Sequence, residues 1–244
     1  MFSIFKKKSS PGVDLSGLVT DMHSHLLPGI DDGSPDTVTS VTLKKGLEEL
    51  GYSKFIATPH IMWDMYKNTA SSIDAALQNL LAADAKNNIR AAAEYYMDDY
   101  FNEQVKNDQP LLTLSGKKVL VEFSFVAPPL DLKDQLFQLQ IKGYEPVLAH
   151  PERYAYFASN KTIYQDFKSM GCLLQLNLLS LTGYYGKTPQ ELANWLISKN
   201  FIDLVGTDLH HHRHLDALRQ GKHIMPAVQQ LLQQGRLLNP MLAA

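Results

Sequence analysis

Short apolar runs alternate with longer amphipathic stretches along the chain, and this alternation limits the available folds more than any other feature. The runs recur at roughly 30-residue intervals, a spacing typical of β–α units. They span 18–23, 54–60, 89–95, 118–124, 145–151, 172–177 and 202–210. Such a pattern predicts seven mostly parallel strands in a sheet that is covered by helices.

The stretches between the runs predict helices over 36–50, 71–87, 98–106, 131–142, 160–170, 188–199 and 221–234. Glycine or asparagine favours helix ends, and four such residues stand where these helices should stop: Gly51, Gly143, Gly171 and Asn200. No Pro/Gly/Ser-rich linker or charge block divides the middle of the 244 residues. We therefore expect one domain over 18–244, preceded by a flexible tail over 1–17.

Composition and charge exclude several classes of protein. A net charge of −2 argues against a nucleic-acid partner, which would usually require a strongly basic surface. The single cysteine, Cys172, excludes an intramolecular disulfide. No run approaches the roughly 20 apolar residues of a membrane span, and the N-terminus lacks the apolar core of a secretory signal. We expect a cytoplasmic protein without a transmembrane segment.

Most of the apolar runs end in histidine, aspartate or glutamate. In a (β/α) barrel the C-terminal ends of the strands share one face, where catalytic residues gather. We therefore expect these polar residues to converge at one mouth, although they lie far apart in the sequence. They are His23, His25, His60, Glu94, Glu122, His150, Asp208 and His210, and the pair Asp31 and Asp32 follows the first run closely.

Most of these residues also have an ordinary structural explanation when taken singly. The Asp31–Asp32 pair suits a solvated turn, and Arg153 could form a surface ion pair with Glu152. Glu122 is harder to explain, because it interrupts an apolar strand where an unpaired carboxylate needs a cation. Imidazole and carboxylate donors without thiolate suit Mn, Fe, Zn or Mg. We expect four further histidines to be solvated: His211, His212, His214 and His223.

The ordered motifs D-M-H-S-H, D-D-G, T-P-H, A-E-Y-Y, V-E-F-S, A-H-P-E-R-Y and T-D-L-H resemble those of the polymerase-and-histidinol-phosphatase (PHP) superfamily. More narrowly, the chain is similar to the bacterial capsule-type protein-tyrosine phosphatases, which are manganese-dependent and oppose the tyrosine kinases of exopolysaccharide synthesis. The similarity extends from about Asp21 to Asn239. It implies a single-domain distorted (β/α)7 TIM-like barrel, the PHP fold, with up to three metal ions.

The resemblance also implies roles for individual residues. His23, His25 and Asp208 would hold one ion, with Glu94 bridging to a second ion. Glu122 and His150 would complete the second site, and Asp32, His60 and His210 would hold a third ion. Two arginines, Arg153 and Arg213, would bind phosphate and act in catalysis. The extra His211 and His212 after the T-D-L-H motif leave the register of Arg213 in doubt.

The implied reaction is attack of a metal-bridging hydroxide on the phosphorus of phosphotyrosine, with Mn²⁺ as the expected ion and Fe, Zn or Mg as alternatives. The implied partner is a phosphotyrosine protein, namely a membrane-associated bacterial tyrosine kinase. Cys172 is not expected to be a nucleophile, because Leu178 stands six residues later where cysteine-based phosphatases have arginine. Aromatic residues are expected near the mouth: Trp63, Tyr66, Tyr95, Tyr96, Tyr154, Tyr184 and Tyr185.

Two other interpretations stay open at this point. One is another PHP phosphoesterase, such as a histidinol-phosphate phosphatase or an exonuclease. The other is a metal-stabilised binding module without turnover.

Overall fold

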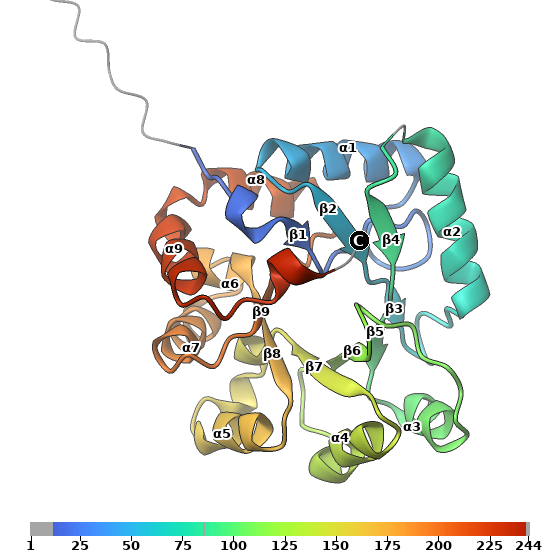
Figure 1. Ribbon diagram of the computed structural model, residues 1–244, viewed down its shortest axis with the longest axis vertical. Coiled ribbons are helices and arrows are strands. Elements are labelled where there is room, and N and C mark those ends of the chain that lie inside the picture. The colour runs from blue at the N-terminus through green and yellow to red at the C-terminus, as the bar shows by residue number, and fades with distance from the viewer. Residues whose placement is uncertain (1–11, 85, 243–244) are drawn as a thin grey trace, which may run out of the picture.

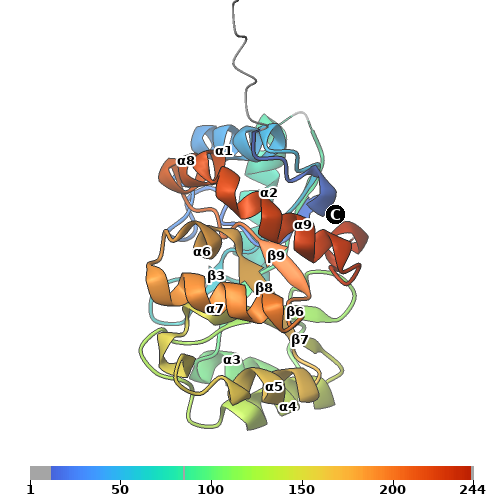
Figure 2. The same ribbon diagram turned by 90° about the vertical axis from the view of Figure 1, so that its left-hand side faces the viewer.

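A computed structural model describes residues 12–84 and 86–242 of the chain as an α/β fold. Figure 1 shows the strands in the interior with the helices arranged around the outside. Figure 2, turned by 90°, shows α6, α7, α8 and α9 on one flank, where α6 contacts both α7 and α8. The strands are β1 Thr20–Asp21, β2 Lys54–Ala57, β3 His60–Ile61, β4 Ile89–Ala91, β5 Glu94–Tyr96, β6 Lys118–Glu122, β7 Glu145–Ala149, β8 Leu173–Asn177 and β9 Leu204–Gly206.

All strand pairs in the two sheets are parallel. One sheet has the order β1-β2-β4, and the other has the order β3-β5-β6-β7-β8-β9. The seven predicted runs are all present, but the second and third runs each contain two short strands. Pro59, which has no backbone N–H, separates β2 from β3 and explains the first interruption.

Successive side chains on each strand pack to opposite sides. On β6, Val119 and Val121 belong to the large apolar core that the helices cover, whereas Leu120 belongs to a second core cluster with Met22 and Ile56. Side chains two residues apart on a strand share a face, so Glu122 lies on the same side as Leu120. The strand period therefore carries this carboxylate toward the second cluster and away from the helices.

The helices that cover the strands are α1 Thr37–Glu49, α2 Ala70–Ala83, α3 Asp99–Lys106, α4 Leu132–Ile141, α5 Thr162–Ser169, α6 Leu178–Thr182, α7 Lys187–Ser198, α8 His212–Gln220 and α9 Met225–Gln233. Side chains cap several N-termini: the Asp36 carboxylate accepts a hydrogen bond from the Thr39 N–H at α1, and Thr69 and Ser72 form a capping box at α2. The predicted stops are confirmed, since Gly51 and Asn200 have the positive φ values of helix ends.

Two helices, α6 and α8, were not expected from the sequence. The stretch over α8 begins with a run of polar histidines that suggested a solvated loop. In the structure the His211 ring caps this helix by accepting a hydrogen bond from the His214 N–H, and Leu215 and Leu218 on one face are buried. Side-chain capping by a histidine and a narrow apolar face are weak signals in a sequence, which explains why the helix was missed.

The expected barrel closure is not confirmed, because β1 and β9 share no continuous ladder in the described residues. Side chains join these two edges instead. The Asn239 amide donates to the Thr20 and Val205 carbonyls, and its oxygen accepts from the Val205 N–H at 2.8 Å. The Asp21 carboxylate accepts from the Thr207 N–H and hydroxyl. Further along, Ser24 and Leu209 form an isolated parallel bridge.

The predicted boundary of the tail at residue 17 lies too late in the sequence. Val13 and Leu15 are buried, and the Leu15 N–H donates to the Leu50 carbonyl at 2.7 Å. Packing of these apolar side chains extends the folded part back to about residue 13, and the rest of the predicted tail, residues 1–11, lies outside the described residues. None of the helices in the described ranges is long and apolar enough to cross a membrane.

Replacing Asn239 with leucine should lower the free energy of unfolding by about 2–4 kcal/mol, because the buried Val205 and Thr20 groups would lose their partners. Urea denaturation with an unchanged m value would measure this loss. Met241→Ala is the control, because Met241 lies in the same short 3-10 helix, Asn239–Met241, but is exposed. Equal midpoints for Asn239→Leu and the wild type would contradict the role of Asn239 in joining β1 to β9.

Candidate metal centre

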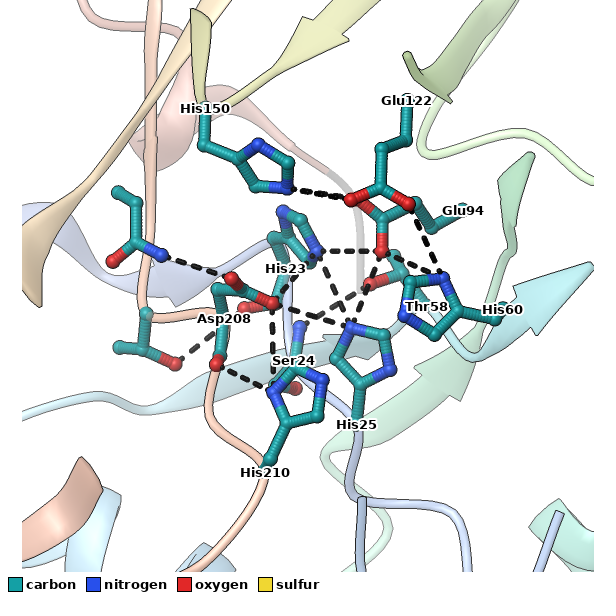
Figure 3. A network of polar contacts seen from close by, with 12 residues as sticks. His23, Ser24, His25, Thr58, His60, Glu94, Glu122, His150, Asp208 and His210 are labelled. Carbon is teal, nitrogen blue, oxygen red and sulfur yellow. Dashed lines mark hydrogen bonds and ion pairs between the residues drawn. The ribbon is translucent and has the colours of Figure 1, made fainter. Parts of the chain in front are cut away.

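The nine predicted metal-ligand side chains lie together, and we call them the ligand cluster: His23, His25, Asp32, His60, Glu94, Glu122, His150, Asp208 and His210. Most of them point toward one another from the ends of different strands (Figure 3). All except Asp32 and His210 are buried. The structure therefore brings these residues together from a sequence span that extends from residue 23 to residue 210.

Backbone hydrogen bonds and backbone conformation at the strand ends orient these side chains. The Asp208 N–H donates to the His23 carbonyl at 2.7 Å, and the His25 N–H donates to the Leu209 carbonyl at 2.9 Å. These bonds place the first histidine pair beside Asp208. His150 and Asp208 have φ values of 32° and 51°, a left-handed conformation that costs non-glycine residues roughly 1–3 kcal/mol and is common at functional sites.

Glu94 occupies the middle of the cluster. Its Oε2 atom lies 3.2 Å from His23 Nε2, 3.3 Å from His25 Nε2 and 3.2 Å from His60 Nδ1. Its Oε1 atom lies 3.2 Å from His150 Nε2. Although Oε2 is buried among three imidazoles, it has no partner with hydrogen-bond geometry among the described residues.

Hydrogen bonds on the outer side of the cluster orient three of the histidine rings. The Nδ1 atom of His23 lies 2.8 Å from Gln175 Oε1, that of His25 lies 2.7 Å from Asp31 Oδ2, and that of His210 lies 2.8 Å from the Asp208 carbonyl. Because these oxygens accept, each Nδ1 carries a proton, and Nε2 faces the cluster as the atom that an ion would bind. This arrangement is typical of metal-ligating histidines.

The donor atoms form three overlapping groups in which all atoms lie within 4.8 Å of one another. The groups are His23, His25, Glu94 and Asp208; His25, Asp32, His60 and His210; and His60, Glu94 and Glu122. The first group has the composition implied by the resemblance. The other two groups differ from the implied ion sites, because His25 and His60 each belong to two groups. His150 belongs to none of the three groups but contacts Glu94 and Glu122.

Burial and charge shift the cluster's pKa values in opposite directions. Burial, the Glu94 charge and the Asp208 charge all raise the pKa of Glu122 well above its usual value. Burial also acts to raise the pKa of Glu94, but His23 and His60 hold it well below its usual value. Burial and the nearby Arg153 lower the pKa of His150 to about 4. Against the effect of burial, the Glu94 and Asp208 charges raise the pKa of His23, and Asp31 and Asp208 hold that of His25 well above its usual value. Protonated imidazoles therefore balance the crowded carboxylates when no ion is bound, and a bound cation would take the place of those protons.

A cavity of about 260 Å³ opens above the cluster. Asp32, His60, Glu122, Asp208 and His210 line it from the ligand cluster, together with Phe125, Arg153, Tyr185, His211 and His214. Arg153 Nη1 lies 2.8 Å from Asp208 Oδ2, so its ion pair is with the cluster and not with Glu152. Glu152 instead accepts from the Asn177 N–H and the Ser180 hydroxyl.

The structure gives no support for Arg213 as a phosphate-binding residue. Arg213 is exposed on α8 and does not line the cavity, whereas His211 and His214 on the same helix do. The helix turns Arg213 away because His211 at the N-cap and His214, three residues later, occupy the inner face. Its assigned role stays a prediction. None of the three donor groups in the described residues includes His211, His212, His214 or His223.

Several residues of the site were not assigned to it from the sequence. Asp31 was expected in a solvated turn, but its side chain is buried beside His25, and its carboxylate also accepts from the His60 N–H at 3.1 Å. Gln175 and Asn177 contact His23 and Asp208. Their signal was present, because these amides occupy the end of the sixth run, where other runs carry ligands. Of the expected aromatic residues, Tyr66 stacks on His60, whereas Tyr95 is buried in the core beside Phe101.

The chain also matches a known protein family. The family model described as "Capsular polysaccharide synthesis, CpsB/CapC" matches residues 19–234, most of the chain. The chain belongs to the CpsB/CapC family. This membership confirms the family resemblance stated from the sequence.

Curated relatives of this CpsB/CapC protein carry phosphatase names. The tyrosine-protein phosphatase YwqE of Bacillus subtilis is 29% identical over 194 residues, which cover 78% of this chain and 76% of YwqE. The putative tyrosine-protein phosphatase CapC of Staphylococcus aureus is 26% identical over 79% of this chain and 77% of its own. The tyrosine-protein phosphatase CpsB of Streptococcus pneumoniae is 25% identical over 78% of this chain and 82% of CpsB.

Solved structures agree with the sequence relatives. A chain from the crystal structures of YwqE and S. pneumoniae CpsB, described as unique metal-dependent tyrosine phosphatases, superposes with a TM-score of 0.75 at 28% identity. The match covers 91% of this chain and 90% of that one. The lactonase Lmo2620 from Listeria monocytogenes shares the fold, with a TM-score of 0.57 at 11% identity over 93% of this chain and 94% of its own.

The donor set of this CpsB/CapC protein fits divalent cations. The Nε2 atoms of oriented imidazoles and oxygens from buried carboxylates face the same space, and Glu94 Oε2 lacks a hydrogen-bond partner there. Mixed imidazole and carboxylate donors without sulfur are the ligands that Mn, Fe, Zn and Mg accept. The residues present therefore satisfy the requirement for a metal-dependent site.

Adding Mn²⁺ to chelator-treated protein should raise the melting temperature by about 5–10 °C at a hundredfold excess over the dissociation constant. Glu94→Gln keeps the shape of the side chain but removes its charge from two of the donor groups, so the rise should shrink and the bound metal should fall. Calorimetry and elemental analysis of protein made without an affinity tag would measure both.

Glu152→Gln is the matched control for this experiment, because Glu152 is a buried carboxylate outside the donor groups. Its metal content should equal that of the wild type. Full metal content in Glu94→Gln would contradict the central position assigned to Glu94.

Proposed function

We propose that this protein is a metal-dependent protein-tyrosine phosphatase that hydrolyses phosphotyrosine at the cavity above the ligand cluster. One observation carries the proposal: the Arg153 guanidinium and the buried cluster of imidazoles and carboxylates line the same cavity. An arginine fork beside a cation site matches the charge and shape of a phosphate monoester. The names of the relatives YwqE, CapC and CpsB support the same activity.

The proposal includes the metal ligands and the finer architecture. All nine members of the ligand cluster would hold up to three ions, with Mn²⁺ as the preferred ion and Fe, Zn or Mg as ions that the same donors accept. The fold would be a distorted (β/α)7 barrel formed by one domain. The seven β regions in sequence order, and the contacts that link β1 to β9, support this description.

Bound divalent cations lower the pKa of water and neutralise the charge on phosphoryl oxygens. The chain's own residues supply the rest of the site. Arg153 donates one N–H to Asp208, and its remaining N–H groups can bind phosphoryl oxygens. Gln175 and Asp31 keep His23 and His25 oriented through hydrogen bonds to Nδ1. The leaving group is a phenolate with a pKa near 10, so its departure demands less proton donation than that of an alkoxide.

The proposed substrate is phosphotyrosine in a flexible protein segment, namely the tail of a membrane-associated bacterial tyrosine kinase, met in the cytoplasm. The capsular synthesis family supports this assignment. An exposed rim is compatible with a protein substrate: Phe125 lines the cavity with 45% of its surface exposed, and the next residue, Val126, is almost fully exposed. A segment of a protein requires such an open edge, whereas a small metabolite favours an enclosed pocket.

Chelation should abolish hydrolysis of p-nitrophenyl phosphate, whereas Cys172→Ala should retain at least half of the wild-type kcat/KM. Cys172 is buried, and burial raises its pKa to about 12, so this thiol is not a nucleophile near neutral pH. Steady-state assays before and after restoring the metal would measure both effects. Loss of turnover in Cys172→Ala at unchanged metal content and melting temperature would overturn the metal-dependent assignment.

A phosphotyrosine peptide should exceed both a phosphoserine peptide and histidinol phosphate in kcat/KM by more than tenfold, a difference of about 1.4 kcal/mol in transition-state binding. All three substrates must be compared under one metal condition, so that only the leaving group and its surroundings differ. If histidinol phosphate were preferred tenfold instead, the protein would be a metabolic phosphatase of the same superfamily.

A further inference from the structure

The guanidinium of Arg153 lies between two aromatic rings. Its Cζ atom is 4.5 Å from the centroid of Phe125 and 4.1 Å from the centroid of Tyr185. Both rings line the same cavity as Arg153. Arginine stacks favourably on aromatic faces through cation–π and planar contacts. The two rings therefore restrain the plane of the guanidinium.

Hydrogen bonds restrain one edge of the same group. Arg153 Nη1 donates to Asp208 Oδ2 at 2.8 Å, and the Asn177 amide donates to the same oxygen at 2.9 Å. The Asn177 amide also lies 3.4 Å from the Tyr185 hydroxyl. The other oxygen of Asp208, Oδ1, lies 3.3 Å from His23 and His25 in the ligand cluster. Asp208 thus links the orientation of Arg153 to the candidate metal centre.

We propose that Phe125 and Tyr185 are positioning residues that hold the Arg153 guanidinium in the orientation that binds the phosphoryl group. This inference rests on the proposed phosphatase function. All guanidinium N–H groups lie in one plane. With the rings beside the plane and one N–H on Asp208, the remaining in-plane N–H groups are left for phosphoryl oxygens.

The exposed position of Phe125 supports this role. Apolar side chains at a loop surface usually contribute little, yet this ring contacts Arg153 and also stacks on His150, with centroids 5.5 Å apart. The next residue, Val126, is twice as exposed at 90% and does not line the cavity. Phe125 is therefore distinguished from its neighbour by its contacts with the site.

Prior orientation of Arg153 reduces the loss of side-chain freedom on binding. A long arginine side chain has many rotamers, and ordering it during association weakens binding. Without a ring on one face, Arg153 keeps its ion pair with Asp208 but can rotate about that contact. The phosphoryl group would then bind more weakly even though Arg153 and the ligand cluster were unchanged.

The test is a double-mutant cycle between each ring and Arg153, measured as binding of inorganic phosphate by calorimetry and as kcat and KM for a phosphotyrosine peptide. The variants are Tyr185→Leu and Phe125→Leu, each alone and combined with Arg153→Ala. Tyr185→Phe and Phe125→Tyr retain the rings, and Val126→Ala is the control outside the cavity. Metal content and melting temperature of each variant exclude unfolding as the cause.

Arg153→Ala should weaken phosphate binding about 10- to 100-fold. Tyr185→Leu and Phe125→Leu should each weaken it about 3- to 10-fold, but neither should add a loss in the Arg153→Ala background. Tyr185→Phe, Phe125→Tyr and Val126→Ala should bind phosphate like the wild type. A ring that is merely structural would not show this dependence on Arg153.

Equal losses from the leucine variants with and without Arg153 would overturn the inference, as would phosphate binding by the wild type that does not depend on Arg153. Tyr185→Leu and Phe125→Leu test the two rings separately, so failure of one variant to fold leaves the other as the test. If the wild type binds phosphate through Arg153 with the expected cycle but does not hydrolyse the peptide, the proposed function fails while the positioning role is supported.

Discussion

Burial of three neighbouring carboxylates is the constraint on which the rest of the site depends. Glu94, Glu122 and Asp208 are at most 3% exposed, and the charges of Glu94 and Asp208 contribute to the raised pKa of Glu122. Carboxylates in such surroundings need positive charge or hydrogen-bond donors. The rings of His23 and His25 have Nδ1 bonded outside the cluster and turn Nε2 inward, and Glu94 Oε2 has no partner with hydrogen-bond geometry in the described chain. Cations satisfy both kinds of group, which makes metal binding the simplest account of the cluster.

The fold meets this constraint by bringing strand ends together. Parallel strands direct their carboxyl ends to one side, and backbone bonds between His23 and Asp208 align the first and last β regions there. The left-handed backbone at His150 and Asp208 turns the chain just after β7 and β9. Such strain is tolerated because the strands around it are well packed. The packing of the strands therefore stabilises the left-handed backbone at their ends, which would be unfavourable without it.

Much of the fold and the site could be predicted from the sequence, and the errors share a physical cause. The seven β regions and eight of the nine ligand candidates were visible as apolar runs with polar ends, whereas Asp32 was implied only by the resemblance to the PHP superfamily. Asp31 was assigned to a solvated turn, because its contact with His25 depends on how the loop folds back. The phosphate-binding role that the motif implies for Arg213 stays a prediction, since the turn of α8 directs His211 and His214 to the cavity. Phe125 gave no signal, because its role depends on contact with Arg153, 28 residues away.

The sequence by itself determined which residue types end each strand, because the two-residue period of strands and the spacing of β–α units are local properties. Tertiary structure decided which atoms those residues present to one another. His23 shows Nε2 to the cluster because Gln175, 152 residues later, accepts from its Nδ1. Arg153 pairs with Asp208, 55 residues later, and not with its neighbour Glu152. Ring orientation, protonation and ion pairing depend on partners from distant strands, and only the folded chain brings those partners within hydrogen-bond distance.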